Sequence, residues 1–308
     1  MAVLTGIDVI GIQSYVFASN RLRDVLAASW MVDHVTSRQQ LEQWPGQEPR
    51  NVLLAAGGTA IVEFENLSAA RNWTALYTRW LVQTAPGLEV VVVHRPREKR
   101  PLAWALKALH LELGRKKLER RPDVPQLGLS VTAPCAVTGL PATADDRGDL
   151  VSPRVEQLRK RVKEAKDRWN EFLPALEHAP GWSPEFPDEL DLMGRTHGET
   201  SLLGVVHVDG NSVGEAIRRW LDRCVEDEVA DVAVRNQYHD WSREIVELGK
   251  AVLRSLAKRT AEHVRREEDR CVLRGTPYEL DGSARVTLSM QSPLFPLPVE
   301  PAPRRDLQ

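Results

Sequence analysis

The chain has 308 residues, of which 42% are hydrophobic and 27% are charged, and its formal net charge is -2. This length is enough for a packed core and two domains, and the near-neutral balance excludes the global basic excess typical of nucleic-acid-binding proteins. The three cysteines, Cys135, Cys224 and Cys271, form no CxxC pair, so we expect neither a cysteine zinc site nor a disulfide framework. The sequence shows no signal peptide and no apolar run long enough to span a membrane, which predicts a cytoplasmic protein without a membrane partner.

Residues 1–98 predict one domain with the element order βαββαβ. The pair Gly57-Gly58 separates two apolar runs and predicts a tight hairpin turn. The predicted strands are Ala2–Ile10, Asn51–Ala56, Thr59–Phe64 and Leu88–His94, and the predicted helices are Asn20–Gln43 and a second one that begins at Ser68. This order is that of the ferredoxin-like arrangement, in which two helices cover one face of an antiparallel sheet.

Residues 99–190 predict a largely helical connector. The expected elements are a helix at Pro101–Arg121, a strand at Gln126–Thr132, a loop at Pro134–Gly148, a charged helix at Pro153–Leu173 and an irregular Pro-rich stretch at Pro174–Pro187. Both helices are rich in Lys and Arg. We interpret these charges as solvated faces, and a track for a nucleic-acid backbone is the alternative.

Residues 191–308 begin like the first domain. Val3–Gly11 and Leu202–Gly210 both read as an apolar strand that ends at a glycine and leads into a helix, which predicts a divergent internal duplication. Further helices are predicted at Val213–Cys224 and at Gln237–Asp269. A strand follows at Arg285–Met290, and the Pro-rich tail, residues 293–308, cannot continue a central sheet. We therefore expect a second domain that is incomplete at its C-terminus, with an exposed strand edge that favours a homodimer or another partner.

The segment from Ser201 to Gly214 carries the main chemical signal. Asp209 stands where the predicted strand ends, and Gly210, Asn211 and Gly214 lead into a helix start. A carboxylate ligates Mg²⁺, and the free N–H groups of a helix N-terminus bind phosphate. The alternative is that Asp209 caps the helix and that the glycines form an ordinary loop.

Four segments in order resemble one known family. They are Gly11–Asn20 together with Leu22-Arg23 and Ala28-Ser29, then Ala56–Gly58, Cys135–Ala142 and Gly194–Gly214. The set resembles the palm domains of the large subunit of type III CRISPR effector complexes. The resemblance implies an α+β chain of two ferredoxin-like palms, the second incomplete here. ATP would bind between the palms with Mg²⁺ or Mn²⁺, cyclic oligoadenylate would be the product, and other effector subunits and guide or target RNA would be the partners.

The resemblance also assigns site residues. Asp209 matches the catalytic, metal-binding acid of the second palm, and Ser29 matches a small polar position near the nucleotide, although an ordinary helix serine is the alternative. The remaining nucleotide-binding positions lie in two turns. Gly57 and Gly58 form the first-palm turn, and Gly210, Asn211 and Gly214 belong to the turn that meets the triphosphate.

The sequence departs from the family at its main catalytic mark. A Gly-Gly-Asp-Asp turn occurs nowhere, and the first-palm turn at Gly57–Ala60 lacks the acids. The nuclease domain that often precedes the palms is not found either. Three hypotheses follow: an active nucleotidyltransferase or cyclase that uses Asp209, a non-catalytic scaffold that binds a nucleotide or a partner, and a truncated or frameshifted cyclase. We expect a family member that is inactive or truncated.

Overall fold

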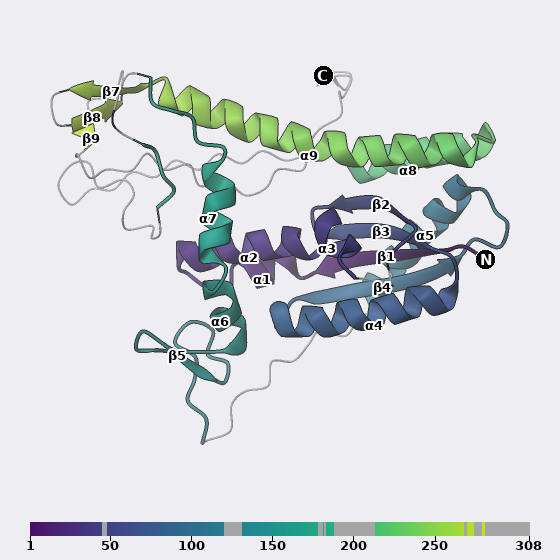
Figure 1. Cartoon of the computed structure of the whole chain (residues 1–308), viewed down its shortest axis with the longest axis horizontal. Helices are drawn as coiled ribbons and strands as arrows, with labels where there is room; N and C mark the ends of the chain where they lie inside the picture. The colour runs from purple at the N-terminus through teal and green to yellow at the C-terminus, as the bar shows by residue number, and fades with distance from the viewer. Residues whose placement is uncertain are drawn as a thin grey trace, which may run out of the picture.

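The computed structural model describes residues 1–44, 48–119, 131–177, 181, 183–187, 213–267, 270–273 and 279–280. The predicted α+β class is confirmed, because helices pack against an antiparallel sheet. The first unit consists of β1 Val3–Ile10, α1 Ile12–Val16, α2 Leu22–Val35, α3 Arg38–Glu42, β2 Asn51–Ala56, β3 Thr59–Phe64, α4 Leu67–Thr84 and β4 Glu89–Pro96. Its strands lie in the order β2-β3-β1-β4 and all pair antiparallel, which is the ferredoxin-like arrangement (Figure 1).

Both faces of this sheet are buried. Because successive strand residues point to opposite faces, Ile7 and Val9 of β1 pack with α2 and α4, whereas Leu4 packs with α5, Leu102–Glu119. A Cβ atom at Gly6 would lie 2.6 Å from Cδ1 of Leu113, so the glycine lets α5 approach β1 closely. Each fully buried large apolar side chain contributes roughly 1.5–3 kcal/mol to the stability of this double-sided core.

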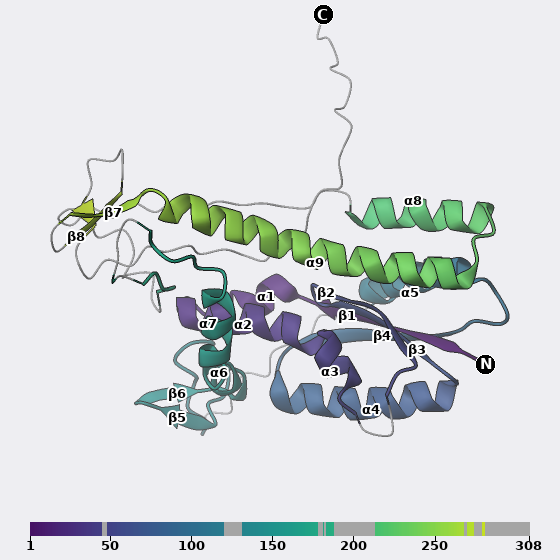
Figure 2. The ribbon, with the colours of Figure 1, turned by 45° about the horizontal axis from the view of Figure 1, so that its top comes forward.

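Helices α8, Val213–Glu226, and α9, Asp231–Ala261, cover the same face as α5. Figures 1 and 2 show α9 running above the sheet along its length, with α8 folded back beside it. The ring of Trp220 on α8 stacks on Tyr238 of α9 with centroids 5.9 Å apart, and both side chains are buried. Two helices predicted for the second domain therefore complete the core of the first.

The end of α9 corrects one prediction. The helix was expected to span Gln237–Asp269, but it begins at Asp231 and ends at Ala261. Strands β7 Val264–Glu267 and β8 Arg270–Leu273 then form a hairpin, with β9 Glu279–Leu280 beside it. Val264 is fully buried at the start of β7, so a β-branched residue inside the predicted helix in fact begins a strand.

The connector also differs from its prediction. The expected loop Pro134–Gly148 contains half of a hairpin, which pairs β5 Ala144–Asp146 with β6 Asp149–Val151. Arg147 and Gly148 both adopt positive φ at its two-residue turn. The expected single helix Pro153–Leu173 is divided into α6 Pro153–Arg159 and α7 Val162–Asn170.

A buried carboxylate docks this connector onto the first unit. Asp24 of α2 is fully buried and accepts a 2.9 Å hydrogen bond from Ser19. Arg159 of α6 places its Nε 3.6 Å from the same carboxylate and donates to Asp146 at 2.6 Å and to Asp149 at 3.2 Å. Charge-assisted bonds of this kind fix orientation as well as position, so α6 and the β5–β6 hairpin are held against α2.

A second buried carboxylate docks α9. Glu63 of β3 is 1% exposed and accepts from Asn51 at 2.7 Å and from Arg235 at 3.1 Å. Arg97 lies 3.6 Å from Glu63 and also pairs with Asp231, whose carboxylate caps the start of α5. The first turn of α9 is thereby tied to the sheet and to α5.

Several predictions fall outside the described residues. These are the strands Leu202–Gly210 and Arg285–Met290, all but the last two residues of Gln126–Thr132, and the tail 293–308. The domain boundaries at 98 and 190, and the second palm, stay predictions. Within the described ranges, no helix has both the length and the apolar character needed to cross a membrane.

Candidate functional site

The turn between β2 and β3 is built on two glycines with different surroundings. Gly57 has a φ of 59° and is exposed, whereas Gly58 has a φ of 85° and is buried. The N–H of Gly58 donates to Oγ1 of Thr36 at 3.2 Å, and its carbonyl accepts from Val9 at 2.7 Å. A Cβ at Gly58 would lie 3.1 Å from Cδ1 of Ile12. Gly58 therefore anchors the turn, and Gly57 is left to face outward.

A cavity of about 90 Å³ opens beside this turn. Ser29 and Gly57, both expected to contact a nucleotide, lie in its lining. Helix α2 supplies one wall through Trp30 and Asp33, the connector a second through Arg168, Trp169 and Phe172, and α9 a third through Ile245, Val246, Gly249, Lys250 and Leu253, while Ala56 ends β2 beside Gly57. Segments from three regions of the chain thus meet at the two residues.

The charges in this lining are paired. Arg168 of α7 forms an ion pair with Asp33 of α2, and both residues line the cavity. Lys250 of α9 donates to Glu247 at 2.7 Å, and both side chains are partly exposed. The half-buried Ser29 hydroxyl makes no hydrogen bond to any residue that the structure describes, so it can still bind a ligand.

Aromatic rings form part of the cavity lining. Trp30 stacks on His34 with centroids 4.4 Å apart and an interplanar angle of 12°. Burial lowers the pKa of His34, and the positive charge of Arg161 lowers it further, so the stacked imidazole is neutral at pH 7. Trp169 packs edge-on against Phe172, with centroids 6.0 Å apart.

Of the other predicted site residues that the structure describes, Gly58 and Gly214 do not line this cavity. Gly214 is exposed in the first turn of α8, where its carbonyl accepts from Arg218 at 3.3 Å, and it does not line the cavity. Asp209, Gly210 and Asn211 lie outside the described residues. Their roles stay predictions.

The described residues do not provide a metal site. Across the described ranges, no group of three or more His, Cys, Asp or Glu side chains has a geometry that could hold a metal ion. The acid in the cavity lining, Asp33, is already paired with Arg168. Because Mg²⁺ in nucleotide enzymes is held by one or two carboxylates together with substrate phosphates, the described residues of this cavity do not fit the predicted ion.

Cys135 is the centre of a small turn in the connector. Its thiol is buried and accepts the N–H of Val137 at 3.4 Å. Burial by itself would raise the pKa of Cys135, but hydrogen bonds led by that from Thr138 outweigh burial and bring the pKa to about 7. The thiol packs with Val151 and Val155, so its position is that of a core residue of the connector.

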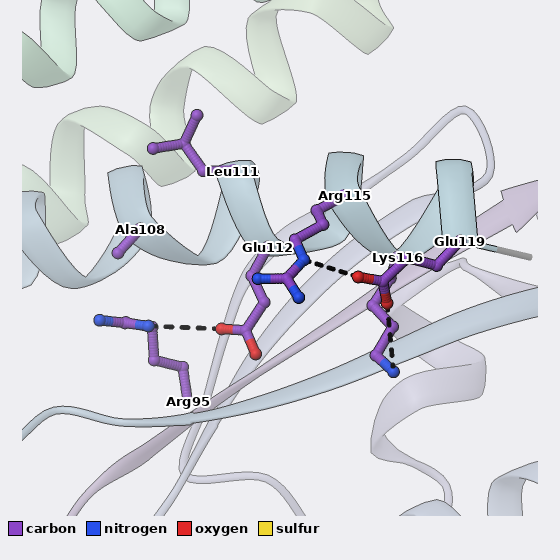
Figure 3. Close-up of a pocket in the computed structure, with 7 residues that line it drawn as sticks. All are labelled: Arg95, Ala108, Leu111, Glu112, Arg115, Lys116 and Glu119. Atoms are coloured by element: carbon purple, nitrogen blue, oxygen red, sulfur yellow. Dashed lines mark hydrogen bonds and ion pairs between the residues drawn. The ribbon is translucent and has the colours of Figure 1, made fainter.

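A larger groove of about 570 Å³ is lined by Arg95 of β4 and by residues of α5 (Figure 3). Its charges are matched in place: Arg95 lies 3.3 Å from Glu112, and Arg115 donates to Glu119 at 2.6 Å. Leu111, also in the lining, is 62% exposed. A groove that offers an exposed apolar side chain and charges that are already paired is better suited to bind a protein surface than to bind an anion.

Sequence reasoning missed the aromatic and cationic members of the cavity. Trp30, Trp169 and Lys250 lie in the predicted helices Asn20–Gln43, Pro153–Leu173 and Gln237–Asp269, but no motif assigned them to a site. Trp30 follows Ser29 directly, which was the one local signal. The other two reach the cavity only through the docking of α7 and α9.

Comparison with family models and with curated proteins finds no match. Among solved structures, the chain is similar to Csm1–Csm4 cassettes. An apo cassette has 24% identity and a TM-score of 0.32, a complex with cA3 has 23% and 0.33, and a complex with one ATP has 25% and 0.32. Each alignment covers 39% of this chain and 19% of the matched chain, so the likeness spans about a fifth of those proteins.

Proposed function

We propose that the chain is a nucleotide-binding protein of the type III CRISPR large-subunit kind, which holds ATP beside the β2–β3 turn and does not convert it. In this proposal the chain is a relative of the cyclic oligoadenylate synthases and acts as a scaffold in an antiviral effector complex. The same binding role would hold if the chain were part of a longer cyclase.

One observation carries the binding role. Ser29 and Gly57 were selected from sequence motifs in different segments, and both line one cavity with an amine, Lys250, and two tryptophans. A free hydroxyl, an exposed turn with positive φ and aromatic rings are the groups that nucleotide pockets combine. The combination supports a nucleotide more than a purely structural packing gap.

The proposed lack of turnover follows from the small number of carboxylates that could hold a metal ion. Phosphoryl transfer between nucleotides depends on metal ions that neutralise the triphosphate. The sequence has no Gly-Gly-Asp-Asp turn, which leaves Asp209 as the single acid assigned to a metal. We therefore propose that Mg²⁺ or Mn²⁺ arrives together with the ATP and that the protein itself holds the ion weakly.

A partner subunit is the second candidate ligand, at a different surface. Leu111 and Leu118 lie seven residues apart on one side of α5 and are 62% and 88% exposed. Two exposed leucines, of which Leu111 lines the groove of Arg95 and Glu112, suit a protein partner, such as another effector subunit. Leu111→Asp with Leu118→Asp would then release such a subunit from the purified complex, whereas Val82→Asp on α4 would not.

The test is to incubate the purified chain with ATP and either Mg²⁺ or Mn²⁺. We expect ATP to be retained on equilibrium dialysis and to be recovered unchanged by chromatography, with the same result for Asp209→Ala. Linear or cyclic oligoadenylate in the wild-type sample would disprove the proposed lack of turnover. Product that persists in Asp209→Ala would also disprove the assignment of Asp209.

A further inference from the structure

We propose that the cavity receives the base of the adenine nucleotide, leaves the phosphates outside, and recognises the base through the indole N–H of Trp169. This inference rests on the function proposed above. It adds which end of the ligand enters and which side chain reads it.

The chemistry of the lining excludes the phosphates. Most lining side chains are aromatic or aliphatic, and the cations Arg168 and Lys250 are already paired with Asp33 and Glu247. A triphosphate would have to displace both carboxylates and lose its hydration in an apolar space, which is unfavourable for an ion. A neutral base meets neither cost.

The size of the cavity leads to the same assignment. Its volume of about 90 Å³ is below the roughly 300 Å³ of the smallest typical ligand pockets. An apolar cavity of about 150 Å³ holds benzene in another protein. The cavity is smaller than that, so only one edge of a flat purine ring can enter it, and the rest of the base, the ribose and the phosphates stay at the mouth beside Ser29 and Gly57.

Trp169 supplies a donor that lacks an acceptor. Its Nε1 is buried and has no hydrogen-bond partner among the described residues. Buried N–H groups in folded proteins nearly always have an acceptor, and the ring nitrogens of adenine are acceptors. Trp30, whose ring is braced by His34, offers a stacking surface in the same cavity, and stacking on aromatic side chains is a general mode of base binding.

Calorimetric titration of the full chain with adenosine, ATP and inorganic tripolyphosphate tests the inference. We expect adenosine to bind within about tenfold of ATP and tripolyphosphate not to compete. Trp169→Phe keeps a ring and removes the N–H, so it should weaken adenosine about five- to tenfold, with an unchanged Tm. Trp104→Phe, on α5 and outside the cavity, should leave binding unchanged.

The possible results are distinguishable. Binding of ATP without adenosine, or competition by tripolyphosphate, would overturn the inference and leave the proposed function intact. Equal adenosine affinity in wild type and Trp169→Phe would overturn the role of Trp169, and no ATP binding would overturn both proposals. If Trp169→Phe lowers the Tm, the titration is repeated on the wild-type protein with adenosine analogues that each lack N1, N3 or N7. One analogue must then bind about five- to tenfold more weakly, and equal binding of all three would overturn the inference.

Discussion

Substitution of Gly58 by alanine should destabilise the unit that carries the cavity. At a φ of 85° the added Cβ costs roughly 1 kcal/mol in backbone strain. The same atom would lie 3.1 Å from Ile12 and 3.3 Å from both Val32 and Val9, which is tight packing against three core side chains. Overpacking of this kind costs about 1–3 kcal/mol, so we expect a total loss of about 2–4 kcal/mol.

Urea unfolding of Gly58→Ala and Gly87→Ala measures the two contributions separately. Gly87 has a similar φ of 79°, but its nearest neighbour would be Cδ of Arg154 at 3.5 Å, an ordinary contact at the end of a flexible side chain. Gly87→Ala should therefore lose about 1 kcal/mol, with the same m-value. Equal losses in the two variants would refute the argument that Gly58 anchors the turn by close packing.

Two further predictions concern the face of the sheet covered by α5 and α9. Glu63→Ala should lower the free energy of unfolding by roughly 3 kcal/mol, because Arg97 and Arg235 lose a buried carboxylate; the exposed Glu65→Ala is the control, and equal stability of the two variants would contradict the docking role. Burial, followed by the charge of Arg218, lowers the pKa of His110 to about 4, while its Nε2 lies 2.8 Å from the Tyr238 hydroxyl. The unfolded chain therefore binds this proton more tightly, so stability is full above pH 6.5 and falls as the pH drops from 6.5 to 4. The free energy of unfolding lost over this pH range is roughly 3 kcal/mol. His110→Gln should remove this part of the pH dependence in chemical unfolding at pH 7 and pH 4.5, and an unchanged slope would show that His110 does not titrate as described.

The sequence predicted elements well where the signal was local. The strands β2 and β3 begin and end at the predicted residues, because Gly57-Gly58 gives an unambiguous hairpin signal between two short apolar runs. The β5–β6 hairpin was missed because its aspartates are rare in strands. Their carboxylates are held by Arg21 and Arg159, which come from other elements.

The candidate site was predictable only in part for the same physical reason. Ser29 and Gly57 were found because short motifs surround them. Trp169 and Lys250 reach the cavity through the packing of α7 and α9, which depends on ion pairs and buried contacts between distant segments. No local pattern encodes such contacts.

Calorimetric titration of ATP into wild type, Ser29→Leu and Ser68→Leu tests whether this cavity is the nucleotide site. Leucine at position 29 would occupy the cavity, whereas Ser68 is exposed on α4, away from it. We predict that wild type and Ser68→Leu bind one ATP per chain, and that Ser29→Leu binds at least tenfold more weakly, a loss of about 1.4 kcal/mol. Equal ATP affinity in all three proteins would contradict the assignment of this cavity as the nucleotide site.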